Sequence, residues 1–196
     1  KRKPLPDNYQ EIFDSHYKSN REGKTTASFI AGKMESWLHQ RVAADVKCCN
    51  DLVTLELGAG TLNQLAYENT ITYDIVEPFD LLLKDSPFLG RVRNIYDDIS
   101  EIPADVKYDR ITSVATYEHI LNLPEVVAKA CLLLNENGCM RTSIPNEGNF
   151  LWKMGWMFTT GLEFKIRTGL DYGVIMRHEH INTANEIEEV LKCFFH

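Results

Sequence analysis

Two glycines and two acidic residues stand where short apolar segments of the sequence end. Gly58 and Gly60 follow the apolar segment 52–57, and glycines there let the chain turn tightly and let a ligand approach the backbone. Glu77 follows the next apolar segment, where a carboxylate can accept hydrogen bonds from both hydroxyls of a ribose. The spacing therefore predicts a nucleoside site. A plain strand-to-helix turn and a surface carboxylate remain the alternatives.

The loop after Gly60 and the acidic pair at residues 97–98 refine that prediction. Leu62 occupies the place where a diphosphate-binding loop carries its third glycine, which argues against a dinucleotide and fits a nucleoside without phosphate. Asp98 can accept a hydrogen bond from the amino group of adenine, and Ile99 offers the ring an apolar contact. A solvated acidic loop is the alternative for Asp98.

Histidines at two places are candidate proton acceptors. His119 follows the fourth apolar segment, and ligands in open α/β sheets bind at the carboxyl ends of strands. His178 and His180 flank Glu179 just before the last predicted helix. Their spacing of two suits an extended segment but not one face of a helix, so we predict no metal site. Helix capping or packing is the alternative for both places.

Apolar strands alternate with helices through the middle of the chain. Strands are predicted at residues 52–57, 72–76, 91–96, 108–115 and 139–144. Helices are predicted at residues 28–46, 124–134 and 184–194, with shorter helical segments at 9–17, 61–68 and 79–84. Thr183 and Glu186 have the spacing of a capping box at the start of the last helix. The alternation predicts βαβ units and a mostly parallel sheet, an α/β fold.

The length of 196 residues suits a single domain. Within residues 1–196 we expect a helical N-terminal cap (1–50), a ligand-binding core (51–146), an aromatic insertion (147–182) and a C-terminal helix (183–196). The aromatic residues of the insertion are Phe150, Trp152, Trp156, Phe158, Phe164 and Tyr172. We expect the insertion to form a lid over the substrate. A plain hydrophobic subdomain or a homodimer face is the alternative.

Charge and cysteine content limit the classes of partner. The net charge of -7 predicts no broad nucleic-acid-binding surface. No apolar run reaches the roughly 20 residues that span a membrane, and the basic start is not followed by the apolar run of a signal peptide. The five cysteines are odd in number and form no CxxC pair, which predicts reduced thiols in the cytoplasm rather than disulfides or zinc.

Five ordered blocks of the sequence resemble the class I S-adenosylmethionine-dependent methyltransferases, in particular the small-molecule branch often labelled type 11 or 12. The blocks are LELGAG, YDIVEP, DDISEIP, YDRITSVATYEHILNLPEVVAKACLLLNENG and SIPNEG. The resemblance covers residues 52–148. It implies a Rossmann-like three-layer sandwich with S-adenosyl-L-methionine as cofactor. The family's sheet usually ends in a further antiparallel hairpin, and we expect this chain to lack that final strand hairpin.

The resemblance also implies a role for each matching residue. The expected cofactor contacts are Glu56 at the methionine amino end, Gly58, Ala59 and Gly60 under the ligand, Glu77 and Pro78 at the ribose, Asp98 and Ile99 at the adenine, and Ala115 and Thr116 beside the methionine part. His119 and His180 are the candidate catalytic residues, because both lie in segments that the family places close to the acceptor.

The expected reaction moves a methyl group to an oxygen or nitrogen atom of a small-molecule acceptor. Sugars and other anionic metabolites are candidate acceptors, because the insertion carries several basic residues, namely Lys153, Lys165, Arg167 and Arg177. Two alternatives stay open. One is a nicotinamide-dependent oxidoreductase on a similar fold, and the other is a non-catalytic fold member that binds the cofactor and acts through partners.

Overall fold

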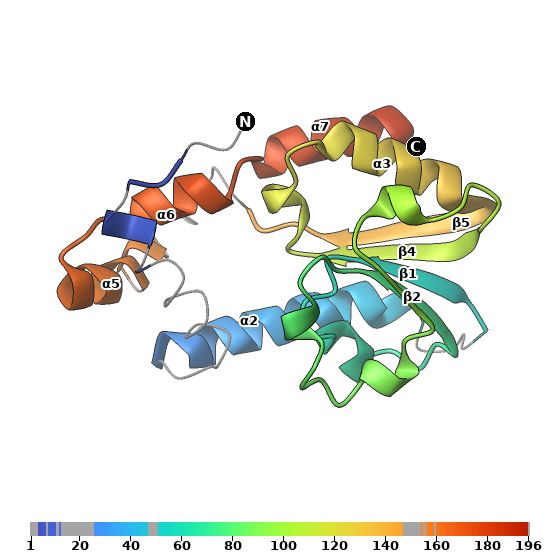
Figure 1. Ribbon diagram of the computed structural model, residues 1–196, viewed down its shortest axis with the longest axis horizontal. Helices are drawn as coiled ribbons and strands as arrows, with labels where there is room; N and C mark the ends of the chain where they lie inside the picture. Colours follow the sequence, from blue (N-terminus) through green and yellow to red (C-terminus); the bar gives the residue numbers. More distant parts are fainter. Residues whose placement is uncertain are drawn as a thin grey trace.

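A five-stranded parallel sheet forms the centre of the computed structural model (Figure 1). The structure describes residues 4–6, 8–10, 12, 26–46, 51–146, 154, 156–158 and 160–195. The strands are β1 (Val53–Leu57), β2 (Thr72–Val76), β3 (Asn94–Tyr96), β4 (Tyr108–Val114) and β5 (Leu134–Ser143). They lie in the order β3-β2-β1-β4-β5, and each neighbouring pair is parallel. The chain order therefore reverses between β1 and β4, the place where open α/β sheets bind ligands.

Helices cover both faces of this sheet, which explains why β1 and β2 are buried at every residue after the first. Helices α3 (Leu123–Leu133) and α7 (Ala184–Phe194) lie side by side on one face, and α2 (Thr26–Val42) crosses the other (Figure 1). The described residues contain no antiparallel strand pair. The predicted α/β fold, a Rossmann-like three-layer sandwich with a mostly parallel sheet, is confirmed. The expected lack of a final strand hairpin stays a prediction.

The two faces of the sheet differ in chemistry. On the α3–α7 side, Leu55 pairs in register with Ile111, and both belong to the largest apolar cluster. On the α2 side, Thr54 and Glu56 of β1 lie opposite Arg110 and Thr112 of β4, and all four are buried. The apolar face therefore stabilises the fold by burial, whereas the α2 face depends on its polar groups finding partners.

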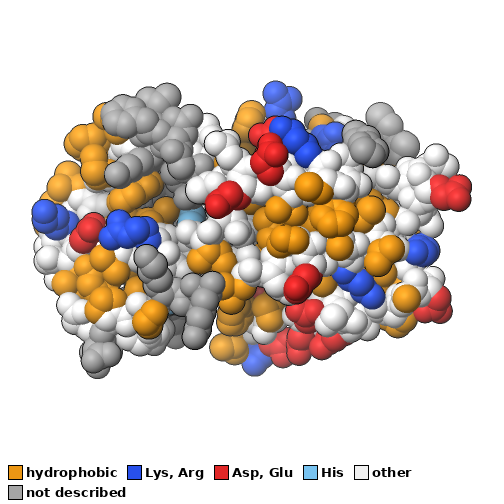
Figure 2. All heavy atoms as spheres, turned by 90° about the horizontal axis from the view of Figure 1, so that it is seen from above, with side chains coloured by type: hydrophobic (Ala, Val, Ile, Leu, Met, Phe, Trp, Pro, Cys, Tyr) orange, Lys and Arg blue, Asp and Glu red, His pale blue; other side chains and the backbone are white. Residues whose placement is uncertain are grey.

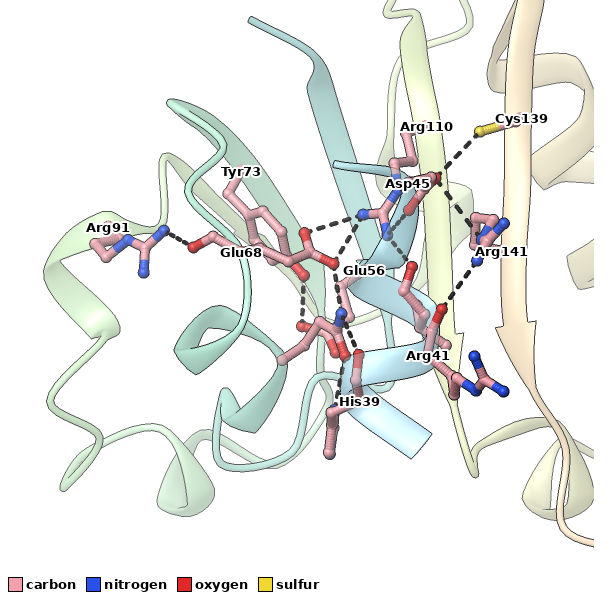
Figure 3. A network of polar contacts seen from close by, with 12 residues as sticks. His39, Arg41, Asp45, Glu56, Glu68, Tyr73, Arg91, Arg110, Cys139 and Arg141 are labelled. Carbon is pink, nitrogen blue, oxygen red and sulfur yellow. Dashed lines mark hydrogen bonds and ion pairs between the residues drawn. The ribbon is translucent and has the colours of Figure 1, made fainter. Parts of the chain in front are cut away.

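Arg110 of β4 bonds to three residues on this face. Its Nη1 donates to Glu68 at 2.9 Å, its Nε donates to Asp45 at 3.0 Å, and its Nη2 donates to the carbonyl of Val42 at 2.9 Å (Figure 3). Asp45 and Val42 lie at the carboxyl end of α2, so these bonds fasten that helix to β4. The Glu68 carboxylate also accepts from Gln64, which in turn bonds to His39 of α2.

Several predicted element boundaries were wrong. The third strand begins at Asn94, because residues 89–91 form a 3-10 turn. Helix α2 gives way to a 3-10 turn at residue 43, and the segments 61–68 and 79–84 each hold only a 3-10 turn. Residues 135–138 belong to β5 rather than to a helix end. The last difference arises because Tyr108 pairs with Leu134 whereas Arg110 pairs with Cys139, which leaves extra β5 residues outside the ladder.

The start of the last helix follows its prediction closely. Thr183 Oγ1 accepts from the backbone N–H of Glu186, and Glu186 Oε2 accepts from the backbone N–H of Thr183 at 2.8 Å. This reciprocal pair is the predicted capping box, and α7 runs over residues 184–194 as expected.

Helices α5 (Thr160–Thr168) and α6 (Tyr172–Glu179) lie beside the sheet (Figure 1). Together with Tyr9 they form an apolar cluster, which we call the helical lobe. Tyr9 is tied to it by a hydrogen bond from the backbone N–H of Asp171 to the Tyr9 hydroxyl at 3.0 Å. The lobe accounts for the predicted aromatic insertion from residue 160 onward. Phe150, Trp152, Lys153 and most of the predicted helix 9–17 lie outside the described residues.

The surface carries both apolar and charged groups. Figure 2 shows hydrophobic side chains gathered over the helical lobe and over the core, with acidic and basic side chains scattered between them. No helix in the described ranges has the length and apolar character needed to cross a membrane. Cys131, Cys139 and Cys193 are free thiols, while Cys48 and Cys49 lie outside the described residues.

Candidate functional site

The glycine loop after β1 and the acid after β2 are joined directly. The backbone N–H of Gly60 donates to Glu77 Oε2 at 2.6 Å, and the N–H of Phe79 donates to Glu77 Oε1 at 3.1 Å. The N–H of Gly58 donates to the carbonyl of Val76 at 2.8 Å, which ties the loop to the end of β2. Both glycines have positive φ angles, +70° at Gly58 and +53° at Gly60, the region that favours glycine. The sequence-predicted ribose acid thus lies against the sequence-predicted loop.

The sequence prediction put Leu62 at the place of a third glycine, but the G-x-G-x-x-G spacing from Gly58 puts that place at Asn63. Leu62 nevertheless adopts the backbone conformation that glycine favours. Its φ is +66°, which costs a leucine roughly 1–2 kcal/mol. Its side chain is fully buried with Leu65, Tyr73 and Leu83, and burial of a leucine contributes about 1.5–3 kcal/mol. Burial therefore offsets the strain, and the loop keeps its turn.

Gly58 is held at the switch point by Thr116, which follows β4. A Cβ atom added at Gly58 would lie 2.3 Å from Thr116 Cγ2 and 2.5 Å from Thr116 Oγ1, so no other residue fits without displacing Thr116. Ala115 has a φ of +50°, and its N–H donates to the carbonyl of Ser143 at 2.9 Å. The structure thereby brings Gly58, at the end of β1, together with Ala115 and Thr116, the two residues predicted beside the methionine part.

Glu56, also predicted at the methionine end, is buried on the α2 side of the sheet. Its Oε2 accepts from the Tyr73 hydroxyl at 3.0 Å, next to the Arg110 network (Figure 3). Burial raises the pKa of Glu56 well above its usual range, and the bond from Tyr73 lowers it only in part. In this structure Glu56 contacts the protein interior, and its role toward a ligand stays a prediction.

The predicted adenine residues follow β3, beside the end of β2. The N–H of Glu77 donates to the carbonyl of Tyr96 at 2.9 Å, which places the two strand ends side by side. Asp98 Oδ1 accepts from the N–H of Ser100 at 2.8 Å, and this bond lowers the pKa of the Asp98 carboxyl. Asp98 is exposed, whereas the Ile99 side chain packs into the apolar cluster on the α3–α7 side. Their contacts with adenine stay predictions.

The two candidate catalytic histidines are in contact through their rings. The His119 and His180 rings lie 4.7 Å apart between centroids, in an edge-to-face arrangement. His119 Nδ1 lies 3.0 Å from the carbonyl oxygen of Glu179. A carbonyl can only accept, so Nδ1 carries the hydrogen and Nε2 is the basic nitrogen of the neutral ring. His119 Nε2 is 3.8 Å from Glu118 Oε1, and the His119 side chain is 40% exposed.

Two structurally important residues were not predicted from the sequence. Arg110 stands in the middle of an apolar strand, and a charged residue there was a signal of a buried ion pair. Asn182 donates through Nδ2 to the carbonyls of Tyr117 and Ile120, on either side of the turn that carries His119. Nothing in the sequence pattern pointed to Asn182. Two predicted contacts remain. Ala59 lies in the glycine loop and is buried, and Pro78 directly follows Glu77 and is exposed.

Comparison with solved structures identifies the fold. A methyltransferase candidate from Bacillus halodurans superposes with a TM-score of 0.55 at 15% identity, over 79% of this chain and 66% of that one. An S-adenosylmethionine-dependent methyltransferase from Thermotoga maritima superposes with a TM-score of 0.54 at 16% identity, over 85% of this chain and 77% of that one. The fold is that of the class I S-adenosylmethionine-dependent methyltransferases.

A third similar structure, the YcgJ protein of Bacillus subtilis, has a TM-score of 0.55 at 12% identity, over 79% of this chain and 67% of that one. The chain thus spans about two thirds to three quarters of the length of these methyltransferase-fold structures. No family model and no curated protein matches the sequence. The similarity therefore shows the fold, whereas the chemistry depends on the residues of the site itself.

Proposed function

We propose that the chain is an S-adenosylmethionine-dependent methyltransferase that moves a methyl group to an oxygen or nitrogen atom of a small molecule. The observation that carries the proposal is the Glu77 carboxylate, which lies beneath the glycine loop at the switch point of a methyltransferase fold. Each carboxylate oxygen accepts one backbone N–H and has a second lone pair for a ribose hydroxyl. The residues present therefore fit the ribose of an adenosyl cofactor.

The same geometry disfavours a dinucleotide. Glu77 Oε2 lies 2.6 Å from the Gly60 nitrogen, so a diphosphate seated on that N–H would meet a carboxylate of like charge. A neutral ribose meets no such repulsion. The third glycine of the G-x-G-x-x-G spacing, which allows close packing of the helix against the strand, is also absent, because Asn63 stands there. Both features favour an adenosyl cofactor over a nicotinamide dinucleotide.

The remaining contacts follow the order of the strand ends. In the proposal, Gly58, Ala59 and Gly60 lie under the cofactor, Pro78 lies beside the ribose, Asp98 and Ile99 contact the adenine, and Glu56, Ala115 and Thr116 face the methionine part. When bound, the cofactor supplies a methyl group on a positively charged sulfur. The chain's own task is to hold the acceptor in line with that methyl group and to exclude water.

His119 would remove the proton that the acceptor loses. Its Nε2 can take a proton from a hydroxyl or ammonium group, because Nδ1–H is engaged by the Glu179 carbonyl. The Glu118 carboxylate, 3.8 Å from Nε2, would stabilise the imidazolium that forms. His180 packs against the His119 ring and would share the acceptor side of the site.

The helical lobe would cover the acceptor, since it adjoins the histidine pair. Three of its side chains are basic, namely Lys165, Arg167 and Arg177, and they favour an acceptor with negative charge, such as an acidic sugar. Arg177 lies 3.9 Å from Asp171 in an exposed ion pair, which leaves its position adjustable. We further propose that the chain acts in the cytoplasm.

Replacing Glu77 by Ala tests the proposal at its central contact. We expect binding of S-adenosylhomocysteine to weaken by about 1–3 kcal/mol, roughly 5- to 150-fold, because the hydrogen bonds to the ribose are lost. Isothermal titration calorimetry measures the change. Glu188→Ala is the matched control, since it removes an exposed carboxylate that pairs with Lys192 on α7. Equal affinities for the wild type and Glu77→Ala would remove Glu77 from the site.

A further inference from the structure

We propose that Asn182 is a positioning residue, which holds the His119 turn against the end of α6 and thereby keeps His119 in the tautomer with Nε2 as its basic nitrogen. The inference rests on the role proposed for His119. It concerns a residue that touches neither cofactor nor acceptor, and it acts through the hydrogen bond between His119 Nδ1 and the Glu179 carbonyl.

The side chain of Asn182 donates hydrogen bonds to both ends of the turn that carries His119. Its Nδ2 donates to the carbonyl of Tyr117 at 2.8 Å and to the carbonyl of Ile120 at 2.7 Å. These two carbonyls bracket Glu118 and His119 in the chain. An amide nitrogen has two hydrogens, so one side chain satisfies both carbonyls. Aspartate offers neither hydrogen and serine offers one, which makes the residue type specific to this arrangement.

The backbone beside Asn182 strengthens the same contact. The N–H groups of Ile181 and Asn182 both donate to the carbonyl of Glu118, at 2.8 and 3.2 Å. Two consecutive residues therefore place four hydrogen bonds on a single short turn. His180 directly precedes this pair, and Thr183 directly follows it as the N-cap of α7. The segment is thus fixed at both ends.

These four hydrogen bonds fix the position of the Glu179 carbonyl relative to the His119 turn. Glu179 is the last residue of α6, and His180 is its C-cap. With the turn fastened to residues 181–182, His119 Nδ1 stays within 3.0 Å of the Glu179 carbonyl, and the His119 and His180 rings stay in contact. Releasing the turn would let the imidazole rotate and exchange its tautomer with the one that predominates in water.

The test reads the tautomer directly. The protein is labelled with ¹⁵N at histidine, and its NMR spectrum is recorded at about pH 9, where an ordinary imidazole is neutral. We expect the spectrum of the wild type to show His119 with its hydrogen on Nδ1. His119→Gln assigns the signal. Asn182→Ala should lose the Nδ1–H tautomer while retaining its affinity for S-adenosylhomocysteine. Asn135→Ala is the matched control, because it removes an amide that donates to the half-buried side chain of Asp109, away from the His119 turn.

An unchanged His119 tautomer in folded Asn182→Ala would overturn the inference. If thermal melting shows that Asn182→Ala does not fold, Asn182→Ser decides: it keeps one donor, and we expect it to fold with a mixture of tautomers. A wild-type spectrum for that variant would also overturn the inference. Failure of the proposed function has a different signature, since wild-type protein would then not bind S-adenosylhomocysteine, whatever the tautomer.

Discussion

Replacing Arg110 by Met is expected to lower the free energy of unfolding by about 3–5 kcal/mol. The Arg110 side chain is fully buried, and so is the Glu68 side chain with which it pairs. Burial raises the pKa of Glu68, and Arg110 opposes that rise. Without the guanidinium, the buried Glu68 carboxylate loses its charged partner, the carbonyl of Val42 loses the hydrogen bond from Arg110, and α2 loses these bonds to β4.

Urea unfolding of the wild type and the variant measures this effect. Arg177→Met is the control, because its ion pair with Asp171 is exposed and should contribute less than about 1 kcal/mol. Arg110→Met combined with Glu68→Gln should recover part of the loss, since the buried charge is then removed as well. A loss below about 1 kcal/mol for Arg110→Met would contradict this account of the α2 face.

Replacing His119 by Gln is expected to lower kcat by roughly 10²- to 10⁴-fold, the usual contribution of a general base. Glutamine can still donate to the Glu179 carbonyl, but it has no basic nitrogen to take a proton from the acceptor. Binding of S-adenosylhomocysteine should stay unchanged, because His119 faces the acceptor in the proposal. The assay follows S-adenosylhomocysteine release across a panel of hydroxyl- and amine-bearing small molecules, with anionic sugars included.

The pH profile of the same assay separates a base from a packing residue. The wild-type rate should rise with pH as the imidazole loses its proton and then level off, whereas the remaining rate of His119→Gln should lack that step. His178→Gln, on the penultimate residue of α6, serves as the matched histidine control. Equal rates for the wild type and His119→Gln would exclude His119 as the base and leave only its packing against His180.

Much of the sheet could be predicted from local sequence. The β2 strand was predicted to the residue, because its apolar run is buried on both faces and ends at Glu77-Pro78. The glycine loop was equally clear, since positive φ angles at Gly58 and Gly60 need glycine. The capping box at Thr183 was also predictable, because both of its hydrogen bonds lie within four residues of sequence.

Other features depend on contacts between distant segments. The segment 61–68 reads as a helix, yet Leu62 takes a left-handed φ to fill the cluster with Leu65 and Tyr73, and only a 3-10 turn follows. The irregular pairing of β5 depends on how it meets β4 at Tyr108. The contact between His119 and His180 depends on where α6 ends, which no local pattern specifies.

Calorimetry on the wild-type chain tests whether the proposed site binds an adenosyl cofactor. The protein would be titrated with S-adenosylmethionine, S-adenosylhomocysteine and NAD under the same conditions. We expect saturable one-to-one binding of both adenosyl ligands and no binding of NAD, because in the proposed site the Glu77 carboxylate at Gly60 accepts ribose hydroxyls and repels a diphosphate. Binding of NAD without either adenosyl ligand would contradict the proposal and favour an oxidoreductase. Absence of all three signals would contradict it equally.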